Sequence, residues 1–432
     1  MNVVISGPFG YGSLADEAVL AGLLKHLPSP KHSVTVLSAD SQRTEQLHAV
    51  SAVEAGAPTA FLSNRSAWTA IQKAHLFVIA SAGPVNELGK YPARLWLAHL
   101  EPVQIAEPKT AVIGIGATPI PIAQDRARVQ RLLHHNAEAV STRDESSKRA
   151  LMACGLAANR VSVTGDPTLA LTCATASGSG TAALPSSAVP AGNTLAVILA
   201  QSVPSRTSFD FQPAAPSPEL QAYTTALIKG LLQHGDAKLL IVHDDTDPSR
   251  KQAEELRAFD FDRIELLAPD EAFADFLQEL AQCRAAFSFS RHGILLSGVC
   301  GVPAVALSEE PGAPELLSAL GLQDFAVDLT NPEAAIAVVA RLAADTSLRT
   351  TLAARVAGLR KREAQNGRIL ELLVPRRVAR ERGIPSEDDE SDEDESGKPK
   401  GPPKPKKMRQ KAFKGKKPGD APSFSPHGRR PR

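Results

Sequence analysis

Three short stretches of this 432-residue chain bring glycine or serine together with charged side chains in a pattern that suits ligand binding. Each follows a run of β-branched residues and leads into a stretch with helical periodicity. In α/β folds such junctions gather at the carboxyl edge of a parallel sheet, where ligands bind. The three stretches are residues 7–18, 141–147 and 288–293.

The first stretch, Gly-Pro-Phe-Gly-Tyr-Gly-Ser-Leu-Ala-Asp-Glu-Ala, is a glycine-rich turn that enters a helix. Its backbone N–H groups and the helix dipole can bind a phosphate or a carboxylate. We therefore take Gly10, Gly12, Ser13, Asp16 and Glu17 as candidate substrate-binding residues. A tight turn without a ligand, in which the two acids only favour the helix dipole, explains the same pattern.

The second stretch, Ser-Thr-Arg-Asp-Glu-Ser-Ser, places Arg143 at the start of a helix. A guanidinium at this edge can hold a phosphate or a carboxylate through two parallel hydrogen bonds. Asp144 is a further substrate-binding candidate, although it can equally be a helix N-cap, with Arg143 a surface ion-pair partner. The Gly-Asp-Pro sequence that follows at Asp166 is more typical of a turn than of a catalytic site.

The third stretch contains His292, the best proton-transfer candidate among the eleven histidines. An imidazole titrates near neutral pH and would face the cleft between two domains beside the basic Arg291. Ser288 and Ser290 flank this pair and complete the set of substrate-binding candidates. A histidine at a helix start that only caps the helix or lies in solvent is the competing interpretation.

The elements that must position these side chains alternate between short strands and amphipathic helices. This alternation predicts an α/β fold with two doubly wound parallel sheets covered by helices on both faces. The expected strands are residues 3–6, 33–38, 76–81, 110–114 and 139–142 in the first half, and 195–200, 238–243, 263–267, 285–290 and 303–307 in the second.

The domain boundary is predicted at 175–194, which is rich in Ser, Gly, Ala and Pro. It separates an N-terminal domain, 1–174, from a C-terminal domain, 195–375. The latter ends in a long polar-faced helix, 347–373, that could pack against either domain. The tail, 384–432, is expected to be disordered because an acidic run followed by Lys, Pro and Gly offers too little apolar surface to offset the ordering entropy.

Composition favours a soluble protein of the cytoplasm. The net charge is only +1, and the first residues already form a strand pattern rather than a secretion signal. No apolar run approaches membrane-spanning length. The four cysteines lie far apart without metal-ligand spacing, so we expect structural thiols and no metal site. They are Cys154, Cys173, Cys283 and Cys300.

Taken in order, these stretches resemble the polysaccharide pyruvyl transferase family. The resemblance covers roughly residues 1 to 325. Family members open with a G-Y-G-N-x-G-D-E-A turn, continue with S-x-R-D-x-x-S and G-D-P, and end with S-x-R-x-H followed nine residues later by G-V-P. The matching positions are Gly10–Ala18, Ser141, Arg143, Asp144, Ser147, Gly165, Asp166, Pro167, His292, Gly301, Val302 and Pro303.

The resemblance implies two Rossmann-like domains arranged as in glycosyltransferases of the B type, with the active site between them. It also implies transfer of a pyruvyl group from phosphoenolpyruvate onto a sugar or polysaccharide precursor of the cell surface. The product is a cyclic ketal on two sugar hydroxyls. Phosphoenolpyruvate is then a donor substrate, and no cofactor is needed. In this scheme His292 is the acid/base, and Arg143 and Arg291 hold the donor.

Several positions depart from the family pattern. Ser13 replaces an Asn and Ala15 replaces a Gly. The family arginine stands two residues before the histidine, where this chain has Ser290, and the arginine is displaced to Arg291. One residue of displacement turns a side chain to another face. A lysine usual after the next strand is also missing.

Two other functions fit the same residues. One is a glycosyltransferase with a nucleotide-sugar donor, whose diphosphate Arg291 could hold. The other is a catalytically degenerate scaffold that binds a glycan or a protein partner. In either case the Lys-rich tail could attract RNA or another anionic polymer by counterion release, or serve only as a solubilising appendage.

Overall fold

The computed structural model describes residues 1–55, 64–85, 96–173, 192–199, 216–233, 235–270, 272–307, 310, 312–345 and 347–373. All of them belong to one compact unit, Met1–Val378, which carries two parallel sheets. Most of the predicted linker 175–194 and the whole of the predicted disordered tail 384–432 lie outside the described residues. Both therefore stay predictions, and so do the domain boundaries that depend on them.

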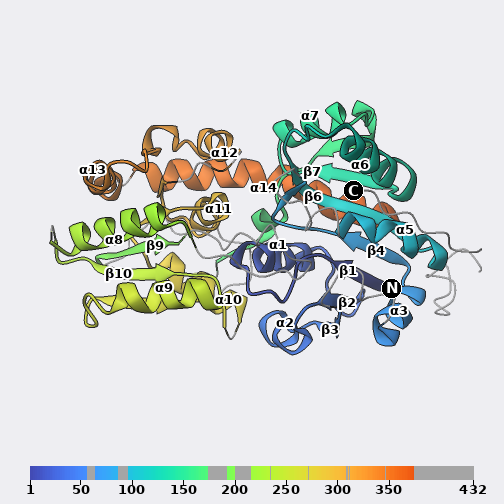
Figure 1. Cartoon of the computed structure of the whole chain (residues 1–432), viewed down its shortest axis with the longest axis horizontal. Coiled ribbons are helices and arrows are strands. Elements are labelled where there is room, and N and C mark those ends of the chain that lie inside the picture. Colours follow the sequence, from blue (N-terminus) through green and yellow to red (C-terminus); the bar gives the residue numbers. More distant parts are fainter. Residues whose placement is uncertain are drawn as a thin grey trace, which may run out of the picture. The chain divides into compact units, whose positions relative to one another are not determined.

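The first sheet has the strand order β3-β2-β1-β4-β6-β7-β8, with β5 paired to β6 (Figure 1). Along the chain, the strands run outward from β1 to β3 and then continue from β4 on the other side of β1. The crossovers before and after this reversal therefore lie on opposite faces of the sheet. The sequence predicted five of these strands and missed β3, β5 and β8, which have only two to four residues. The strands are β1 (Asn2–Ser6), β2 (Ser33–Ser38), β3 (Ser51–Glu54), β4 (Leu76–Ile79), β5 (Pro84–Val85), β6 (Lys109–Ala117), β7 (Ala139–Thr142) and β8 (Val161–Val163).

Separate hydrophobic clusters cover the two faces of this sheet. On β1, Val4 joins one cluster while Val3 and Ile5 join the other. This alternation follows from the period of two along a strand, and burial of both faces explains the nearly continuous apolar character of β1 and β4. The helical elements that cover the faces are α1 (Leu14–Lys25), α2 (Ser41–His48), α3 (Arg65–Gln72), α5 (Leu100–Val103), η2 (Gln104–Ala106), α6 (Ala123–Asn136), α7 (Glu145–Ala153), η3 (Ala158–Arg160) and η4 (Pro167–Ala170).

The second sheet repeats the same plan in the order β11-β10-β9-β12-β13, and every pairing is parallel. All five predicted strands are present. They are β9 (Thr194–Ile198), β10 (Lys238–Val242), β11 (Ile264–Leu267), β12 (Ala285–Ser288) and β13 (Ala304–Ala306). Their helical neighbours are α8 (Pro218–Gln233), α9 (Asp247–Arg257), α10 (Phe273–Ala281), α11 (Arg291–Val299), α12 (Ala313–Leu320), η5 (Gln323–Phe325) and α13 (Pro332–Ala344). The predicted architecture of two doubly wound Rossmann-like sheets is confirmed.

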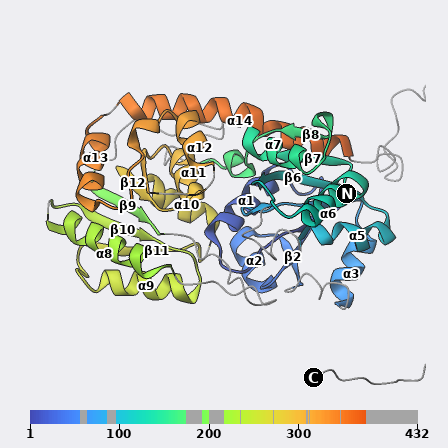
Figure 2. The ribbon, with the colours of Figure 1, turned by 45° about the horizontal axis from the view of Figure 1, so that its top comes forward.

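The long closing helix α14 (Ser347–Leu373) has the bounds that the sequence predicted, and it packs on both halves (Figures 1 and 2). At its start, Arg349 donates to the carbonyl oxygens of Gly301, Cys283 and Arg284 in the second half. Towards its end, Leu370 enters an apolar cluster of the first half. The helix therefore joins the two sheets through contacts along its length.

A buried amide on α14 reaches the loop that carries Asp166. Asn366 is fully buried, and its Nδ2 donates to the carbonyl oxygen of Gly165 at 3.2 Å. Its Oδ1 accepts from the hydroxyl of Ser141 at 3.0 Å. The same hydroxyl oxygen accepts the backbone N–H of Gly114 in β6. Because every partner is buried, these bonds fix the loop before η4 relative to the first sheet.

All four cysteines are buried and unpaired by disulfides. Within the described ranges, no helix combines the length and the apolar character needed to cross a bilayer.

Replacement of Asn366 by Leu should destabilise the protein, because it leaves a buried carbonyl and a buried hydroxyl without their partners. Each such loss costs roughly 1–3 kcal/mol. Urea unfolding would measure the change, with Gln365→Leu on the exposed side of the same helix as the control. Equal unfolding free energies for the two variants would show that the amide contributes nothing.

Candidate active site

The candidate active site is centred on Asp166, a buried carboxylate at the start of η4. Its Oδ1 accepts the backbone N–H of Thr168 and so caps this short helix. Its Oδ2 lies 3.1 Å from Nη1 of Arg291 and 3.2 Å from Nε2 of His292. A carboxylate of the first half thus meets two cationic or titratable side chains of the second half.

Arg143 joins this cluster from the end of β7. Its side chain is only 6% exposed, and Nη1 donates to the carbonyl oxygen of Ala82 at 2.9 Å. A Cβ on Gly116 would lie 2.5 Å from the guanidinium carbon, so this glycine is what lets the guanidinium lie against β6. The alternative of a surface ion-pair partner is therefore wrong for Arg143.

Asp144 combines the two roles that the sequence left open. It is the N-cap of α7, because Oδ1 accepts the backbone N–H of Ser147 at 2.7 Å. Its Oδ2 lies 3.3 Å from Nε of Arg143 and 3.7 Å from Nη2 of Arg291. The carboxylate therefore stands between two guanidinium groups from different halves of the molecule.

Arg291 and His292 are the first two residues of α11, and both are buried. Displacement of the arginine by one residue does not remove it from the site, since its guanidinium contacts both Asp166 and Asp144. Ser290, which stands at the usual arginine position, is the N-cap of α11 and accepts the N–H of Gly293. The three side chains predicted to act together therefore converge on the two aspartates.

Three nitrogen atoms in this cluster are buried and make no hydrogen bond within the described part of the chain. They are Nε of Arg143, Nε of Arg291 and Nε2 of His292. The 3.2 Å contact between His292 and Asp166 has ion-pair distance but not hydrogen-bond geometry. Buried polar groups are nearly always satisfied in folded proteins, so this concentration of unsatisfied groups indicates a ligand site.

Burial and charge shift the titration of each group in the cluster. Burial lowers the pKa of Arg143 to about 10, and the neighbouring Arg291 adds to the effect. Burial also lowers the pKa of His292, although Asp166 opposes this shift. Burial alone would raise the pKa of Asp166, but His292 and the two guanidinium groups hold it well below its usual range. At neutral pH the cluster therefore contains an ionised Asp166 and a His292 ring biased towards its neutral form.

Asp144 is likewise held in its charged form. Burial acts to raise its pKa, whereas the hydrogen bonds from Ser147 and the guanidinium groups of Arg143 and Arg291 together lower it. Two arginines and two carboxylates therefore face one another in a site largely shielded from solvent, where their attraction is stronger than in water.

The glycine-rich turn makes protein contacts at the groups that were expected to face a ligand. The N–H of Leu14 donates to Oδ1 of Asp244 at 2.9 Å, and the carbonyl oxygen of Gly12 accepts the N–H of Asp245. A Cβ on Gly12, whose φ is +81°, would lie 2.3 Å from the carbonyl oxygen of Asp245. In this structure a carboxylate of the second half occupies the N-terminus of α1 where an anion was expected.

The acids of the turn are also bonded within the protein. Oε1 of Glu17 accepts the N–H of Gly10, and its Oε2 lies 2.8 Å from Nε2 of His48 in a fully buried pair. The Oγ of Ser13 accepts the N–H of Asp16 as the N-cap of α1. A direct role of these residues in substrate binding stays a prediction.

Asp16 connects the turn to Arg143. Its buried Oδ1 accepts the N–H of Ala82 at 2.9 Å, while the carbonyl oxygen of Ala82 accepts from Arg143. Burial raises the pKa of Asp16 to about 7. The residue therefore holds the loop after β4 on which Arg143 rests.

The two serines of the third stretch shape the turn before α11. Both are fully buried, and the hydroxyl of Ser288 donates to the carbonyl oxygen of Ser290 at 2.8 Å. Their contacts are structural, and substrate binding by either serine stays a prediction. Within the described residues, no group of three or more His, Cys, Asp or Glu side chains is placed to hold a metal ion.

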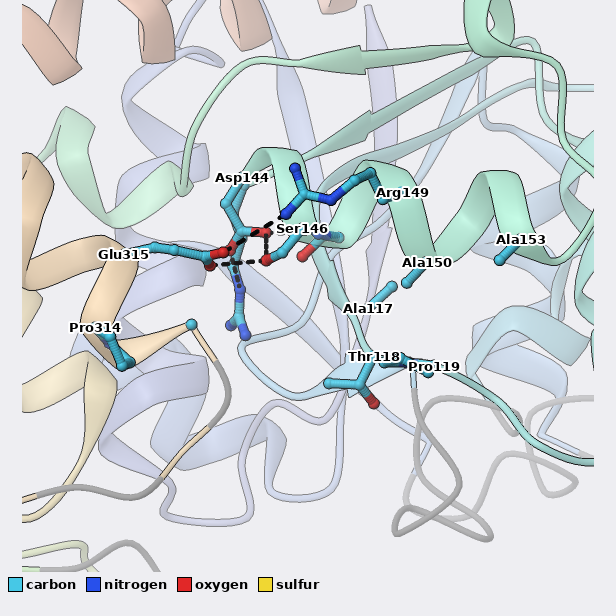
Figure 3. A pocket seen from close by; sticks show the side chains of 13 residues that line it. Ala117, Thr118, Pro119, Asp144, Ser146, Arg149, Ala150, Ala153, Pro314 and Glu315 are labelled. Carbon is cyan, nitrogen blue, oxygen red and sulfur yellow. Dashed lines mark hydrogen bonds and ion pairs between the residues drawn. The ribbon is translucent and has the colours of Figure 1, made fainter.

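A cavity of about 460 Å³ adjoins the cluster (Figure 3). One wall comes from the end of β6 and from α7, and the other from the start of α12. Arg143 and Asp144 line it, whereas Asp166 and His292 are not among its lining residues. The size is typical of a small-molecule site.

Sequence reasoning missed Asp166 as a functional candidate. It treated the Gly-Asp-Pro sequence as a turn signal, and the residue is indeed a helix cap. Its position in the family pattern between the Arg143 stretch and the His292 stretch was the available signal. Only the fold places this carboxylate against Arg291 and His292.

The fold is α/β, with two parallel doubly wound sheets in the glycosyltransferase-B-like arrangement. The sequence profile of the family called polysaccharide pyruvyl transferase matches residues 16–311, which is more than half of the chain. This chain belongs to the polysaccharide pyruvyl transferase family, a family of transferases. A comparison with curated protein sequences finds no match.

Similar solved structures agree on the fold. A putative UDP-N-acetylglucosamine 2-epimerase from Listeria monocytogenes is 16% identical, with a TM-score of 0.56 over 89% of this chain and 98% of that one. The S. aureus MnaA–UDP structure is 12% identical, with a TM-score of 0.53 over 82% and 91%. Anabaena Alr3699/HepE in complex with UDP and glucose is 14% identical, with a TM-score of 0.52 over 86% and 100%. At these identities the likeness concerns architecture alone.

Replacement of Asp16 by Asn should remove a pH-dependent loss of stability. Between the pKa of an unfolded Asp, near 4, and about 7, only the folded state keeps the proton, so stability falls as the pH rises through this window. The shift corresponds to on the order of 4 kcal/mol in total. The neutral amide cannot ionise, so the variant should be the more stable protein at pH 8.

Urea unfolding between pH 4 and pH 8 would test this expectation, with Asp275→Asn on the exposed face of α10 as the control. Parallel stability curves for the wild type and Asp16→Asn would show that the folded state ionises Asp16 as easily as the unfolded state does.

Proposed function

We propose that this protein transfers a pyruvyl group from phosphoenolpyruvate onto two hydroxyls of a sugar destined for a cell-surface polysaccharide. The observation that carries the proposal is the group of three buried, unsatisfied nitrogens on Arg143, Arg291 and His292. Family membership supports the same reaction. The donor carries a phosphate and a carboxylate, the groups that guanidinium side chains bind best.

The two arginines are assigned to the donor. Asp166 contacts Nη1 of Arg291, and Asp144 contacts Nη2 of Arg291 and Nε of Arg143, so the two carboxylates orient both guanidinium groups. This leaves the Nε–H of Arg291 for the ligand. The longest of these contacts, 3.7 Å between Asp144 and Arg291, is the one that the incoming anion most easily replaces. Directly after β13, the described residues 307, 310 and 312–315 include no lysine, so the proposal assigns the donor phosphate to these two guanidinium groups.

His292 is assigned to proton transfer. Formation of the ketal releases two protons from the sugar hydroxyls: one ends on the methylene carbon of the donor, which becomes a methyl group, and the other leaves with the phosphate. A ring biased towards its neutral form can accept the proton of the attacking hydroxyl and pass it to the methylene carbon. Asp166, beside the ring, stabilises the imidazolium that forms in between.

The two alternative functions, a glycosyltransferase with a nucleotide-sugar donor and a catalytically degenerate scaffold, are tested by the same experiments. The solved structures with bound UDP share the fold, which is compatible with a nucleotide-sugar donor but does not favour it. A degenerate scaffold would retain sugar binding without donor binding. Contact of the tail with RNA or another anionic polymer stays a proposal of its own, since the tail lies outside the described residues.

Millimolar phosphoenolpyruvate should raise the Tm of the wild type by a few degrees, because a ligand stabilises the state that binds it. Arg143→Ala should abolish this increase, whereas Arg65→Ala, at an exposed arginine of α3, should retain it. Differential scanning fluorimetry with UDP in parallel separates the alternatives. A shift with UDP and none with phosphoenolpyruvate would favour the nucleotide-sugar donor.

The ring of His292 should titrate below about 6.5, the ordinary value for histidine, because burial disfavours its charged form. Nitrogen NMR of histidine-labelled protein would measure the midpoint, with His292→Gln to assign the signal and the urea-unfolded chain as the reference. Since the neutral ring is the acceptor, activity dependent on it should persist to the same low pH. A midpoint above that of the unfolded chain would contradict both the electrostatics and the assigned role.

A further inference from the structure

Two of the four cysteines form a close pair where the chain passes from the first half to the second. Sγ of Cys173 lies 2.8 Å from Sγ of Cys300, although the two residues are 127 positions apart in the sequence. Cys173 follows η4 and is the last described residue before residue 192. Cys300 is the C-cap of α11, the helix that begins with Arg291 and His292. The pair therefore lies between the end of the first half and a helix that carries two residues of the candidate site.

Hydrogen bonds arrange the two thiols so that one sulfur faces the other. The Cys300 thiol donates to the carbonyl oxygen of Leu277 in α10 at 3.5 Å. Because a thiol has a single proton, this bond leaves the lone pairs of the Cys300 sulfur to accept from the thiol of Cys173. From this arrangement, small rotations of the two side chains bring the sulfurs to bonding distance.

A guanidinium lies next to the pair. Arg360 of α14 donates from Nε to the carbonyl oxygen of Leu169 at 3.0 Å and from Nη2 to that of Leu171 at 2.6 Å. Burial raises the pKa of the Cys300 thiol well above its usual range, whereas this guanidinium acts in the opposite direction. A nearby cation favours the thiolate, which is the reactive form of cysteine. The pair thus combines a thiol partner with a positive charge, two features common to redox-active cysteines.

The other two cysteines have different surroundings. Cys154 packs in an apolar cluster on the first sheet, whereas the pair belongs to the cluster of the second half. Cys283 shares that second cluster, but it is fully buried, and burial raises its pKa to about 12. Cys173 is the most exposed of the four, at 8%. A small oxidant therefore meets Cys173 first, and the other two cysteines serve as internal controls.

We propose that Cys173 and Cys300 form a reversible disulfide when a peroxide reaches the protein. The sulfur of Cys173 attacks one peroxide oxygen, the O–O bond breaks, and Cys173 becomes a sulfenic acid with release of water. The sulfur of Cys300 then attacks the sulfur of Cys173, the S–O bond breaks, and the hydroxyl leaves as water with the Cys300 proton. Overall, two thiols are oxidised to one disulfide while one peroxide is reduced to two waters. A dithiol restores the pair by exchange.

The disulfide ties the end of α11 to the segment that leaves the first half. It closes a loop that runs from β9 through α11, so it removes conformational freedom mainly from the unfolded chain. The apolar cluster around the pair can hold a disulfide because, like a protonated thiol, it is uncharged. Oxidation therefore stabilises the fold, and this chemistry is independent of pyruvyl transfer.

Peptide mapping of the full chain after treatment with peroxide tests this proposal. Reduced protein is exposed to millimolar hydrogen peroxide, the remaining thiols are blocked with N-ethylmaleimide in urea, and the unreduced digest is measured by mass spectrometry. We expect a cross-linked peptide that contains Cys173 and Cys300, and a Tm about 5 °C above that of the reduced protein. Dithiothreitol should reverse both changes.

Serine variants separate the pair from the other cysteines. Cys173→Ser and Cys300→Ser should lose the cross-link and the increase of Tm, whereas Cys154→Ser and Cys283→Ser should keep both. Protein that is unfolded in urea before oxidation should form other pairings as well, because the fold no longer holds the two sulfurs together.

A wild-type digest in which Cys173 and Cys300 remain alkylated after peroxide treatment, or in which either is linked to Cys283, would overturn the proposal. A cross-link that lowers the Tm or leaves it unchanged would also contradict it, because the bond would then strain the folded state. Since the mapping is done on the wild type, this result holds even where a serine variant does not fold.

Discussion

The buried carboxylate of Asp166 is the interaction on which the arrangement of the site depends. It belongs to the first half of the chain, yet its partners Arg291 and His292 begin a helix of the second half. A buried charge that loses its partner is far more costly than an exposed one, so this contact strongly favours one relative position of the two sheets. The same contact places the side chains of Arg291 and His292 near Arg143. The contacts of Asp166 with Arg291 and His292 therefore both hold the two halves together and assemble the site.

Around this centre, a carboxylate of one half repeatedly meets a donor of the other. Asp244 accepts the N–H that begins α1, and Glu315 accepts from Ser146 on α7. The helix N-terminus that usually attracts a ligand is thereby used for contact between the halves. Asp16 accepts the N–H of Ala82, whose carbonyl oxygen accepts from Arg143, so these contacts link the glycine turn to the site.

The closing helix α14 adds a second set of contacts between the halves. Its Arg349 binds carbonyl oxygens of the second half, and its Asn366 binds the residue before Asp166. These hydrogen bonds tie the position of the loop before η4 to the packing of a helix far along the chain. The cluster around Asp166 is consequently held from three sides: by β7 through Arg143, by α11 through His292, and by α14 through Gly165.

The candidates Arg143, Arg291 and His292 could be chosen from the sequence because each follows a strand pattern and leads into a helical pattern. Period-two and helical patterns predicted ten strands and the bounds of α14, since burial on both faces leaves a continuous apolar signal. The short strands β3, β5 and β8 gave too little of that signal. Tertiary structure alone decided which carboxylate accompanies the chosen cations, because Asp166 and His292 are brought together by the packing of two sheets and not by their spacing. It also decided that Leu14 meets a protein carboxylate, since a helix N-terminus attracts any anion and only the fold determines which one arrives.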